Sequence, residues 1–183
     1  MRLFTAIDLP AEIRNLLVEV ITKLRPLARI TWSRPENLHI TTKFIGQWPE
    51  ERLQELNALL AGLTPRARIP IQVRGLGFYP GAKYPRVFWA GVEAPPELTA
   101  LASETDRALA KLGLEPESRA YSPHLTLARF KQPSGLEAFH KAVVGLGQPE
   151  FGAFEADRFY LYLSKPGPGG SVYTRLSEFP FST

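Results

Sequence analysis

Two ten-residue stretches, 85 positions apart, decide how this chain folds: residues 37–46 read NLHITTKFIG and residues 122–131 read SPHLTLARFK. Each contains a histidine and a threonine separated by one apolar residue, as His39-Ile40-Thr41 and as His124-Leu125-Thr126. Successive side chains of a β-strand point to opposite faces, so each histidine shares a face with its threonine. We therefore predict two strands that each present His and Thr to one side and apolar residues to the other.

The similarity between the two halves extends beyond these motifs. When the chain is aligned with itself at an offset of 85 residues, 16 of 98 positions are identical, whereas ordinary composition would give roughly 6 or 7. Strand-like segments at residues 3–10, 88–95 and 173–180 fall in the same register, and each ends in an acidic residue, any residue and proline. We interpret residues 1–183 as a single bilobal domain built from an internal repeat, and gene duplication would explain it.

The hydrophobic pattern predicts the same order of elements in both halves. Apolar residues at helical spacing predict helices over residues 12–24, 50–60, 98–112 and 136–144. Strands are predicted at residues 3–10, 38–45, 69–78, 86–92, 124–130, 154–163 and 172–176, with an exposed turn at residues 166–170. This order predicts an α+β fold: two similar lobes of antiparallel sheet flanked by helices, with a pseudo-two-fold axis and a central cleft. The end of the chain is expected to complete a sheet begun elsewhere.

Composition limits the possible functions. The absence of cysteine excludes disulfides, thiolate zinc sites and a cysteine nucleophile. Lys and Arg outnumber Asp and Glu by 22 to 18, and the pI near 9.5 suits a polyanionic ligand. No apolar run approaches the roughly 20 residues of a membrane span, and Asp8 and Pro10 interrupt the N-terminal apolar stretch. We expect a monomeric cytoplasmic protein that does not insert into a membrane.

Two imidazoles across one cleft could perform acid–base chemistry on a phosphate without a metal or other cofactor. One would take a proton from the attacking water and the other would protonate the departing oxygen, and histidine can do either near neutral pH. The hydroxyls of Thr41 and Thr126 could donate hydrogen bonds to phosphate oxygens. Strand alternation places Lys43 on the face of His39, and Arg129 follows the position equivalent to Lys43. Both are candidates for binding the phosphate.

Further residues are candidates for contacts with RNA. Aromatic side chains could stack on a base or pack in the core, and these are Phe44, Tyr121 and Tyr173. Basic side chains outside the motifs could steer RNA toward the cleft, and these are Arg66, Arg68, Arg74, Lys83, Arg86 and Lys131.

The sequence resembles the two-histidine phosphoesterases over nearly the whole chain, in residues 2–10, 37–46, 85–92 and 122–129 and as far as residues 172–173. It is most similar to their 2′-5′ RNA ligase or RNA 2′,3′-cyclic phosphodiesterase branch. The resemblance implies that the protein hydrolyses RNA 2′,3′-cyclic phosphate ends to 2′-phosphates. It also implies the reverse formation of 2′-5′ linkages between RNA ends such as tRNA halves.

The resemblance further implies that His39 is the general acid and His124 the general base, an order that the residues alone leave open. Thr42 stands where the family usually has an aliphatic residue. Because strand alternation turns Thr42 away from the cleft, we expect little effect on activity.

Two other hypotheses remain open. A metal-dependent hydrolase would use the histidines as ligands, although neither motif carries the carboxylate or third close histidine that such sites normally recruit. A non-catalytic RNA- or nucleotide-binding module would use the same cleft without turnover. Activity in the presence of a chelator would discriminate against the first, and turnover of a 2′,3′-cyclic nucleotide against the second.

Overall fold

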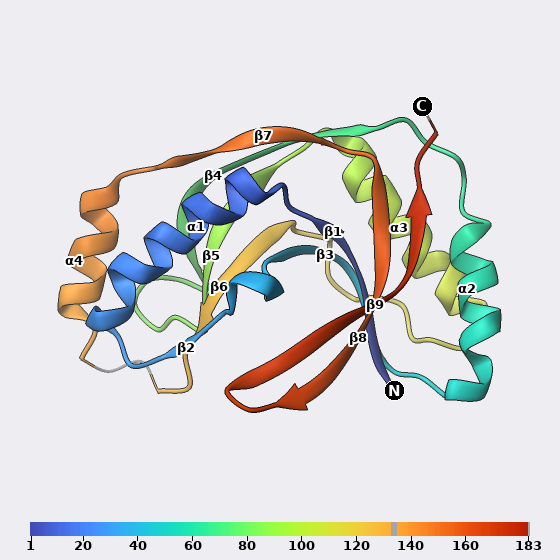
Figure 1. Ribbon diagram of the computed structural model, residues 1–183, viewed down its shortest axis with the longest axis horizontal. Coiled ribbons are helices and arrows are strands. Elements are labelled where there is room, and N and C mark those ends of the chain that lie inside the picture. The colour runs from blue at the N-terminus through green and yellow to red at the C-terminus, as the bar shows by residue number, and fades with distance from the viewer. Residues whose placement is uncertain (133–134, 183) are drawn as a thin grey trace.

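The computed structural model describes residues 1–132 and 135–182, which form two antiparallel sheets and four α-helices (Figure 1). The strands are β1 (Arg2–Asp8), β2 (Thr31–Trp32), β3 (His39–Gln47), β4 (Ile69–Tyr79), β5 (Val87–Glu93), β6 (His124–Arg129), β7 (Glu150–Ala156), β8 (Arg158–Gly167) and β9 (Gly170–Pro180). The helices are α1 (Ala11–Leu24), α2 (Leu53–Ala61), α3 (Pro96–Ala110) and α4 (Glu137–Leu146). Short 3₁₀ turns occupy Arg25–Leu27, Pro35–Asn37 and Glu50–Arg52.

The two sheets each combine strands from both ends of the chain. Sheet A has the order β3-β1-β8-β9 and sheet B the order β2-β6-β5-β4-β7, with antiparallel pairing throughout. Strand β8 from the second half pairs with β1 from the first, and β4 from the first half pairs with β5 from the second. The predicted α+β fold with antiparallel sheets is confirmed, as is the return of the chain end to a sheet begun by β1.

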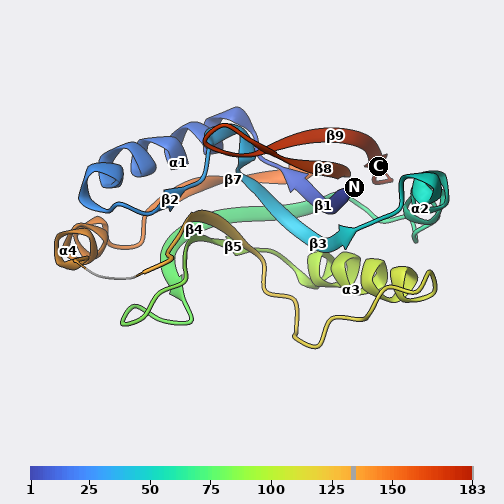
Figure 2. The same cartoon turned by 90° about the horizontal axis from the view of Figure 1, so that it is seen from below.

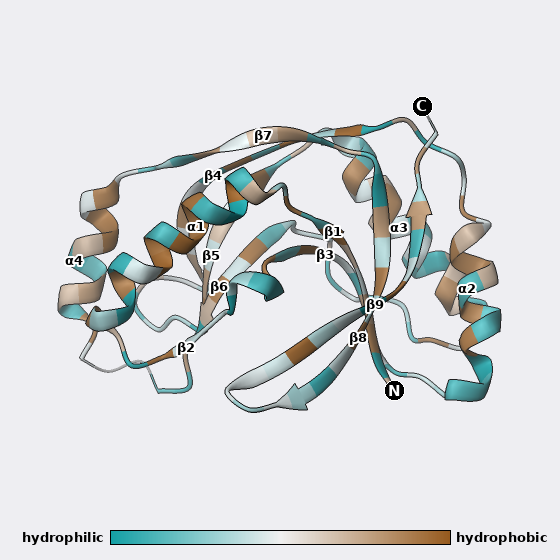
Figure 3. Ribbon diagram, viewed as in Figure 1, coloured by the Kyte–Doolittle hydropathy of each residue, from teal (hydrophilic) through white to brown (hydrophobic). Residues whose placement is uncertain are grey.

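The helices cover opposite sides of the molecule. Figure 2 shows α1 above the sheets and α3 below them, with α4 and α2 at opposite ends. Helix α1 contacts β7 of sheet B, and α3 contacts β3 of sheet A. Each helix is amphipathic, as the hydropathy colouring of Figure 3 shows, and the apolar residues of α1 at helical spacing are buried. The other face of each sheet is left for the site.

Elements of the two halves correspond at the predicted spacing. Strands β1 and β5 begin and end 85 residues apart, and helices α1 and α3 both begin directly after the acid-x-Pro segments. The predicted helices and most predicted strands are found within a few residues of their expected bounds. One helix differs at its start, because residues 50–52 form a 3₁₀ turn and α2 begins at Leu53. The duplication itself remains our interpretation of this correspondence.

The prediction of one strand over residues 154–163 is wrong. The segment is divided at Asp157 into β7, which pairs with β4 in sheet B, and β8, which pairs with β1 in sheet A. Apolar residues are present on both sides of the division, so the hydrophobic pattern does not reveal that the chain changes sheets there. The predicted turn near residues 166–170 is confirmed as the connection between β8 and β9.

No helix within residues 1–132 and 135–182 is long and apolar enough to cross a membrane.

Candidate active site

The two His-x-Thr strands meet at the boundary between the sheets. Strands β3 and β6 are in contact although they belong to different sheets (Figure 1). Thr41 lies opposite Ala6 on β1, and Thr126 lies opposite Trp89 on β5. Opposite residues of an antiparallel pair point to the same face. Thr41 therefore shares a face with Ala6, and Thr126 shares a face with Trp89. For sheet A this face carries the aromatic cluster of Phe4 and Tyr162, outside the main hydrophobic core.

A β-bulge directly follows each motif. Thr42 has no pairing partner on β1, and Leu127, 85 residues later, has none on β5. A bulge places two consecutive residues of one strand against a single residue of its partner, and this interrupts the alternation of faces. Thr42 is buried, and its Oγ1 lies 2.7 Å from Oγ1 of Thr5 on the core side of sheet A. The prediction that Thr42 faces away from the cleft is therefore confirmed.

The prediction that Lys43 continues the face of His39 is wrong, because the bulge turns Lys43 to the opposite face. Its Nζ donates hydrogen bonds to Asp106 Oδ1 at 2.7 Å and Glu117 Oε1 at 2.9 Å, and its side chain is 3% exposed. Burial alone would lower the pKa of the Lys43 ammonium, but these two carboxylates raise it above its ordinary value. The charge of Lys43 therefore stabilises the packing of β3 and is not presented to a phosphate.

The corresponding bulge in the second half brings Arg129 to the face of the site. Arg129 lies opposite Val87, two residues along β5 from the partner of Thr126. Its side chain is exposed, and the described residues supply no ion-pair partner. The equivalent position in the first half is Phe44, which is 60% exposed and lies opposite Phe4. The site thus has a cation at one end and an exposed aromatic ring at the other.

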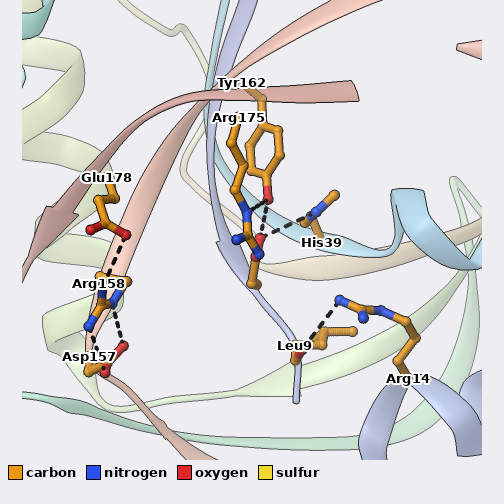
Figure 4. Close-up of polar contacts among 9 residues, drawn as sticks. Leu9, Arg14, His39, Asp157, Arg158, Tyr162, Arg175 and Glu178 are labelled. Atoms are coloured by element: carbon orange, nitrogen blue, oxygen red, sulfur yellow. Dashed lines mark hydrogen bonds and ion pairs between the residues drawn. The ribbon is translucent and has the colours of Figure 1, made fainter. Parts of the chain in front are cut away.

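His39 belongs to a polar network centred on Asp8. Its Nε2 lies 3.3 Å from Asp8 Oδ1, and its side chain is only 5% exposed. Tyr162 donates its hydroxyl to the same carboxylate, and the Arg175 guanidinium binds it as well (Figure 4). The imidazole ring also lies 4.6 Å from the ring of Tyr162 and 5.9 Å from that of Tyr173. Packing and hydrogen bonding together fix the orientation of His39.

Asp8 is held in its ionised form. Burial raises the pKa of the Asp8 carboxyl, but hydrogen bonds from His39 and Tyr162 and the positive charge of Arg175 outweigh this effect. The net pKa lies below the ordinary value of 3.8. Burial and the bond to Asp8 also raise the pKa of the Tyr162 hydroxyl, which therefore remains a donor. The Asp8 carboxylate can thus accept from the imidazole at neutral pH.

His124 has a different environment. It is exposed, and its Nδ1 lies 2.9 Å from the backbone carbonyl of Ser122. When Nδ1 carries the proton it donates to this carbonyl, which leaves Nε2 with a free lone pair. That tautomer can accept a proton from a substrate.

A shift in strand register accounts for this asymmetry. Asp8 lies opposite His39, and its counterpart 85 residues later is Glu93, but the residue opposite His124 is Gly91. The pairing of β5 with β6 is thus displaced by two residues relative to that of β1 with β3. Glu93 instead accepts a hydrogen bond from Arg74 at 2.8 Å. Among the residues that the structure describes, the second histidine therefore has no carboxylate neighbour equivalent to Asp8.

Comparison with known protein families assigns the chain to one of them. A sequence profile described as LigT like Phosphoesterase matches residues 7–89 and again residues 91–173. The chain belongs to the LigT-like phosphoesterase family. The resemblance inferred from the two motifs is thereby confirmed.

Relatives of this LigT-like phosphoesterase match it over nearly its whole length. A Methanothermobacter thermautotrophicus protein named RNA 2′,3′-cyclic phosphodiesterase is 33% identical over 181 residues, covering 98% of each chain. The crystal structure of TT0787 of Thermus thermophilus superposes with a TM-score of 0.84 at 32% identity and covers 99% of this chain and 98% of that one. The crystal structure of Escherichia coli LigT complexed with 3′-AMP gives a TM-score of 0.81 at 27% identity, covering 100% and 98%.

The aromatic candidates of this LigT-like phosphoesterase have distinct surroundings. Tyr121 donates its hydroxyl to the backbone carbonyl of Thr41 at 2.8 Å, and burial raises its pKa above the ordinary value. It thereby links the segment that precedes His124 to β3. Tyr173 packs edge-on against Phe4 at 4.8 Å between ring centres. Phe44 is the most exposed of the three and is the best placed to stack on a base.

The charged residues of the surface are partly neutralised. Among the predicted RNA-steering residues, Arg66 is bound by Glu104, and Arg74 by Glu93 and, more distantly, by Glu150. Within residues 1–132 and 135–182, no group of three or more His, Asp or Glu side chains is arranged to hold a metal ion.

Four further residues of the site did not stand out in the sequence: Asp8, Tyr162, Arg175 and Gly91. The acid-x-Pro pattern located Asp8 in the repeat, but it gave no indication that this carboxylate pairs with His39.

Proposed function

We propose that this LigT-like phosphoesterase hydrolyses 2′,3′-cyclic phosphate ends of RNA to 2′-phosphates, by acid–base catalysis with two histidines. The observation that carries the proposal is the contact between β3 and β6, with two imidazoles in unequal environments at the junction of the sheets. The names of several relatives, including that from Methanothermobacter thermautotrophicus, support the substrate. RNA fragments with such ends, including tRNA fragments, are the proposed partners of a monomeric cytoplasmic enzyme that needs no cofactor.

His124 takes the role of general base. With Nδ1–H donated to the Ser122 carbonyl, Nε2 is free to accept the proton of the attacking water. The oxygen of this water forms a bond to phosphorus while the bond from phosphorus to the ribose 3′-oxygen breaks. A 2′-phosphate results.

His39 takes the role of general acid and protonates the departing 3′-oxygen. Asp8 holds the imidazole through Nε2, which fixes the ring in the cleft but also engages one of its two nitrogens. Nδ1 is buried and has no hydrogen-bond partner among the described residues. We propose that a small movement of the ring on substrate binding directs its Nε2–H from Asp8 to the departing oxygen, since catalytic hydrogen bonds often reach their final geometry only in the complex.

Thr41, Thr126 and Arg129 stabilise the charge on the phosphate. The two hydroxyls donate to non-bridging oxygens from either side, and the guanidinium adds a positive charge on the His124 side. Ligation of a 2′,3′-cyclic phosphate to a 5′-hydroxyl end is the same reaction with an alcohol in place of water, and we propose it as a second activity of the site.

Product analysis of an RNA oligomer with a 2′,3′-cyclic phosphate, in the presence of a chelator, tests the proposal. We expect a 2′-phosphate as the product. The rate should fall about 10²- to 10⁴-fold in each of the single variants His39→Ala and His124→Ala. His140→Ala is the matched control, because this third histidine packs beside Phe78 and Phe139 and away from both motifs. Turnover that survives in His124→Ala, or that the chelator abolishes, would contradict the mechanism. Binding without any turnover would favour an RNA-binding module.

A further inference from the structure

A pocket opens beside His124. It has a volume of about 560 Å³ and lies on β4 and β5, next to the loop that leads into β6. Its lining includes Arg74, Gly75, Trp89, Gly91, Glu93 and Pro123. Gly91 is the pairing partner of His124, and Pro123 directly precedes it. The pocket is therefore lined by two neighbours of the proposed general base, and its volume lies in the range of small-molecule sites.

One glycine of the pocket lining and one glycine beneath its tryptophan shape the pocket. A Cβ on Gly77 would lie 2.2 Å from Cζ2 of Trp89, so the indole rests directly against the backbone of β4. A Cβ on Gly91 would lie 2.4 Å from the carbonyl oxygen of Arg74, so no side chain can be accommodated at this position opposite His124. Trp89 is thereby fixed as a flat aromatic wall beside Thr126, its partner on β6. Such a wall can stack on any nucleobase.

The charges of the pocket disfavour a phosphate and suit an uncharged nucleoside. Arg74 donates its Nε–H to Glu93 Oε1 at 2.8 Å, and its Nη1 is 3.9 Å from Glu150 Oε1. Two carboxylates thus face one guanidinium, which leaves an excess of negative charge. Carboxylate oxygens accept hydrogen bonds from ribose hydroxyls and from the amino groups of bases, but they repel phosphate oxygens.

We propose that this pocket binds the nucleoside of an RNA end that carries a 5′-hydroxyl, and so serves as the acceptor subsite for ligation. The inference rests on the proposed function, because it assigns the His124 side to the attacking group. The 5′-hydroxyl gives its proton to His124 as its oxygen forms the bond to phosphorus. The bond from phosphorus to the 3′-oxygen breaks, and this oxygen takes a proton from His39. A 2′-5′ phosphodiester and a free 3′-hydroxyl result, and no further reactant is needed.

Partition between hydrolysis and transfer tests the subsite. Turnover of a nucleoside 2′,3′-cyclic phosphate is measured in a chelator with rising concentrations of adenosine, and the 2′-phosphate and the 2′-5′ dinucleotide are quantified. We expect the dinucleotide fraction to saturate with adenosine. Trp89→Ala should raise the adenosine concentration at half-saturation about tenfold or more, since loss of one base stack typically costs that much. Trp89→Phe keeps an aromatic ring, so its adenosine concentration at half-saturation should stay close to that of the wild type. In Trp89→Ala, the KM for the cyclic phosphate should change far less than the adenosine concentration at half-saturation.

The charged rim gives a second arm to the test. Glu93→Gln should weaken the binding of adenosine and should reduce the preference for adenosine over 5′-AMP. Glu97→Gln, on the exposed first turn of α3, should change neither quantity. A dinucleotide fraction that rises linearly without saturation would overturn the proposal. So would an equal rise of the cyclic-phosphate KM in Trp89→Ala, which would assign the pocket to the other nucleoside.

Direct binding separates this proposal from the proposed function. Adenosine should quench the tryptophan fluorescence of the wild-type protein and should not quench that of Trp89→Phe, in which only Trp32 and Trp48 remain. If no cyclic phosphate is turned over but this quenching saturates, the proposed function fails and the nucleoside pocket stands. If turnover is normal and the quenching is absent, the pocket fails alone.

Discussion

Asp8 lies opposite His39 in the pairing of β1 with β3, and its Oδ1 is 3.3 Å from His39 Nε2. At the equivalent place beside His124, the pairing of β5 with β6 puts Gly91. One register shift therefore gives one histidine a carboxylate partner and gives the other open space. The two imidazoles of the site are made unequal by strand pairing, although their motifs are alike.

Replacement of Asp8 by Asn should slow catalysis while leaving substrate binding nearly intact. An amide keeps the shape of the carboxylate but removes its charge, so the orientation of His39 is weakened. We expect kcat to fall by about 10- to 100-fold, less than on loss of the imidazole itself. Steady-state kinetics on a 2′,3′-cyclic nucleotide measures this change, with Glu12→Gln on α1 as the control. An unchanged kcat would show that Asp8 does not position His39.

The same substitution should alter the dependence of stability on pH. Because the native pKa of Asp8 lies below its unfolded value, the ionised carboxylate contributes stability that is fully present above the unfolded value of about 3.8. This contribution is lost as pH falls through the native pKa. Urea unfolding of the wild type from pH 6 to pH 2 should therefore show a loss of stability that is smaller in Asp8→Asn. Parallel curves for the two proteins would refute this.

Lys43 and Arg129 should respond in opposite ways to replacement by Met. Lys43→Met leaves Asp106 and Glu117 without their cation, and we expect about 2 kcal/mol of lost unfolding free energy. Arg129→Met removes an exposed side chain, so stability should change by less than about 0.5 kcal/mol, but kcat/KM should fall by roughly 10- to 100-fold through loss of a charged hydrogen bond. Chemical denaturation and kinetics on both variants distinguish these roles. A catalytic defect in Lys43→Met without destabilisation would reverse our assignment.

The buried hydroxyls of Thr5 and Thr42 provide a test of the bulge. Thr42→Val leaves the Thr5 hydroxyl buried without its partner, which should cost about 1–3 kcal/mol of unfolding free energy. Replacing both residues by Val removes both polar groups, and we expect most of the stability to return. Catalytic activity should be unaffected in either variant, since both side chains lie on the core side. Equal destabilisation of the single and double variants would contradict the paired burial of the two hydroxyls.

The fold and the two strands that carry the motifs could be predicted from the sequence, because both depend on local periodicity. Strand alternation along β3 predicted that His39 and Thr41 share one face. The same alternation along β6 predicted that His124 and Thr126 share one face. Alternation failed at Lys43, because a bulge depends on pairing with a second strand and leaves no signature in the spacing of apolar residues. The role of Asp8 could not be predicted for the same reason, because it too depends on the pairing of two strands. Which residue faces which across a sheet is decided by register, and the two halves have different registers although their motifs are alike.

The exchange of β4 and β8 between the halves bears on how such a chain could have arisen. A single half would hold β1 with one neighbour only, and the edge that β8 now covers would be exposed. An unpaired strand edge readily recruits a strand from another molecule. Two copies of a half-length ancestor would have closed each other's sheets by swapping this strand, with one histidine from each copy in a shared site. On this hypothesis, joining the two copies into one chain would then have freed each half to change its register independently.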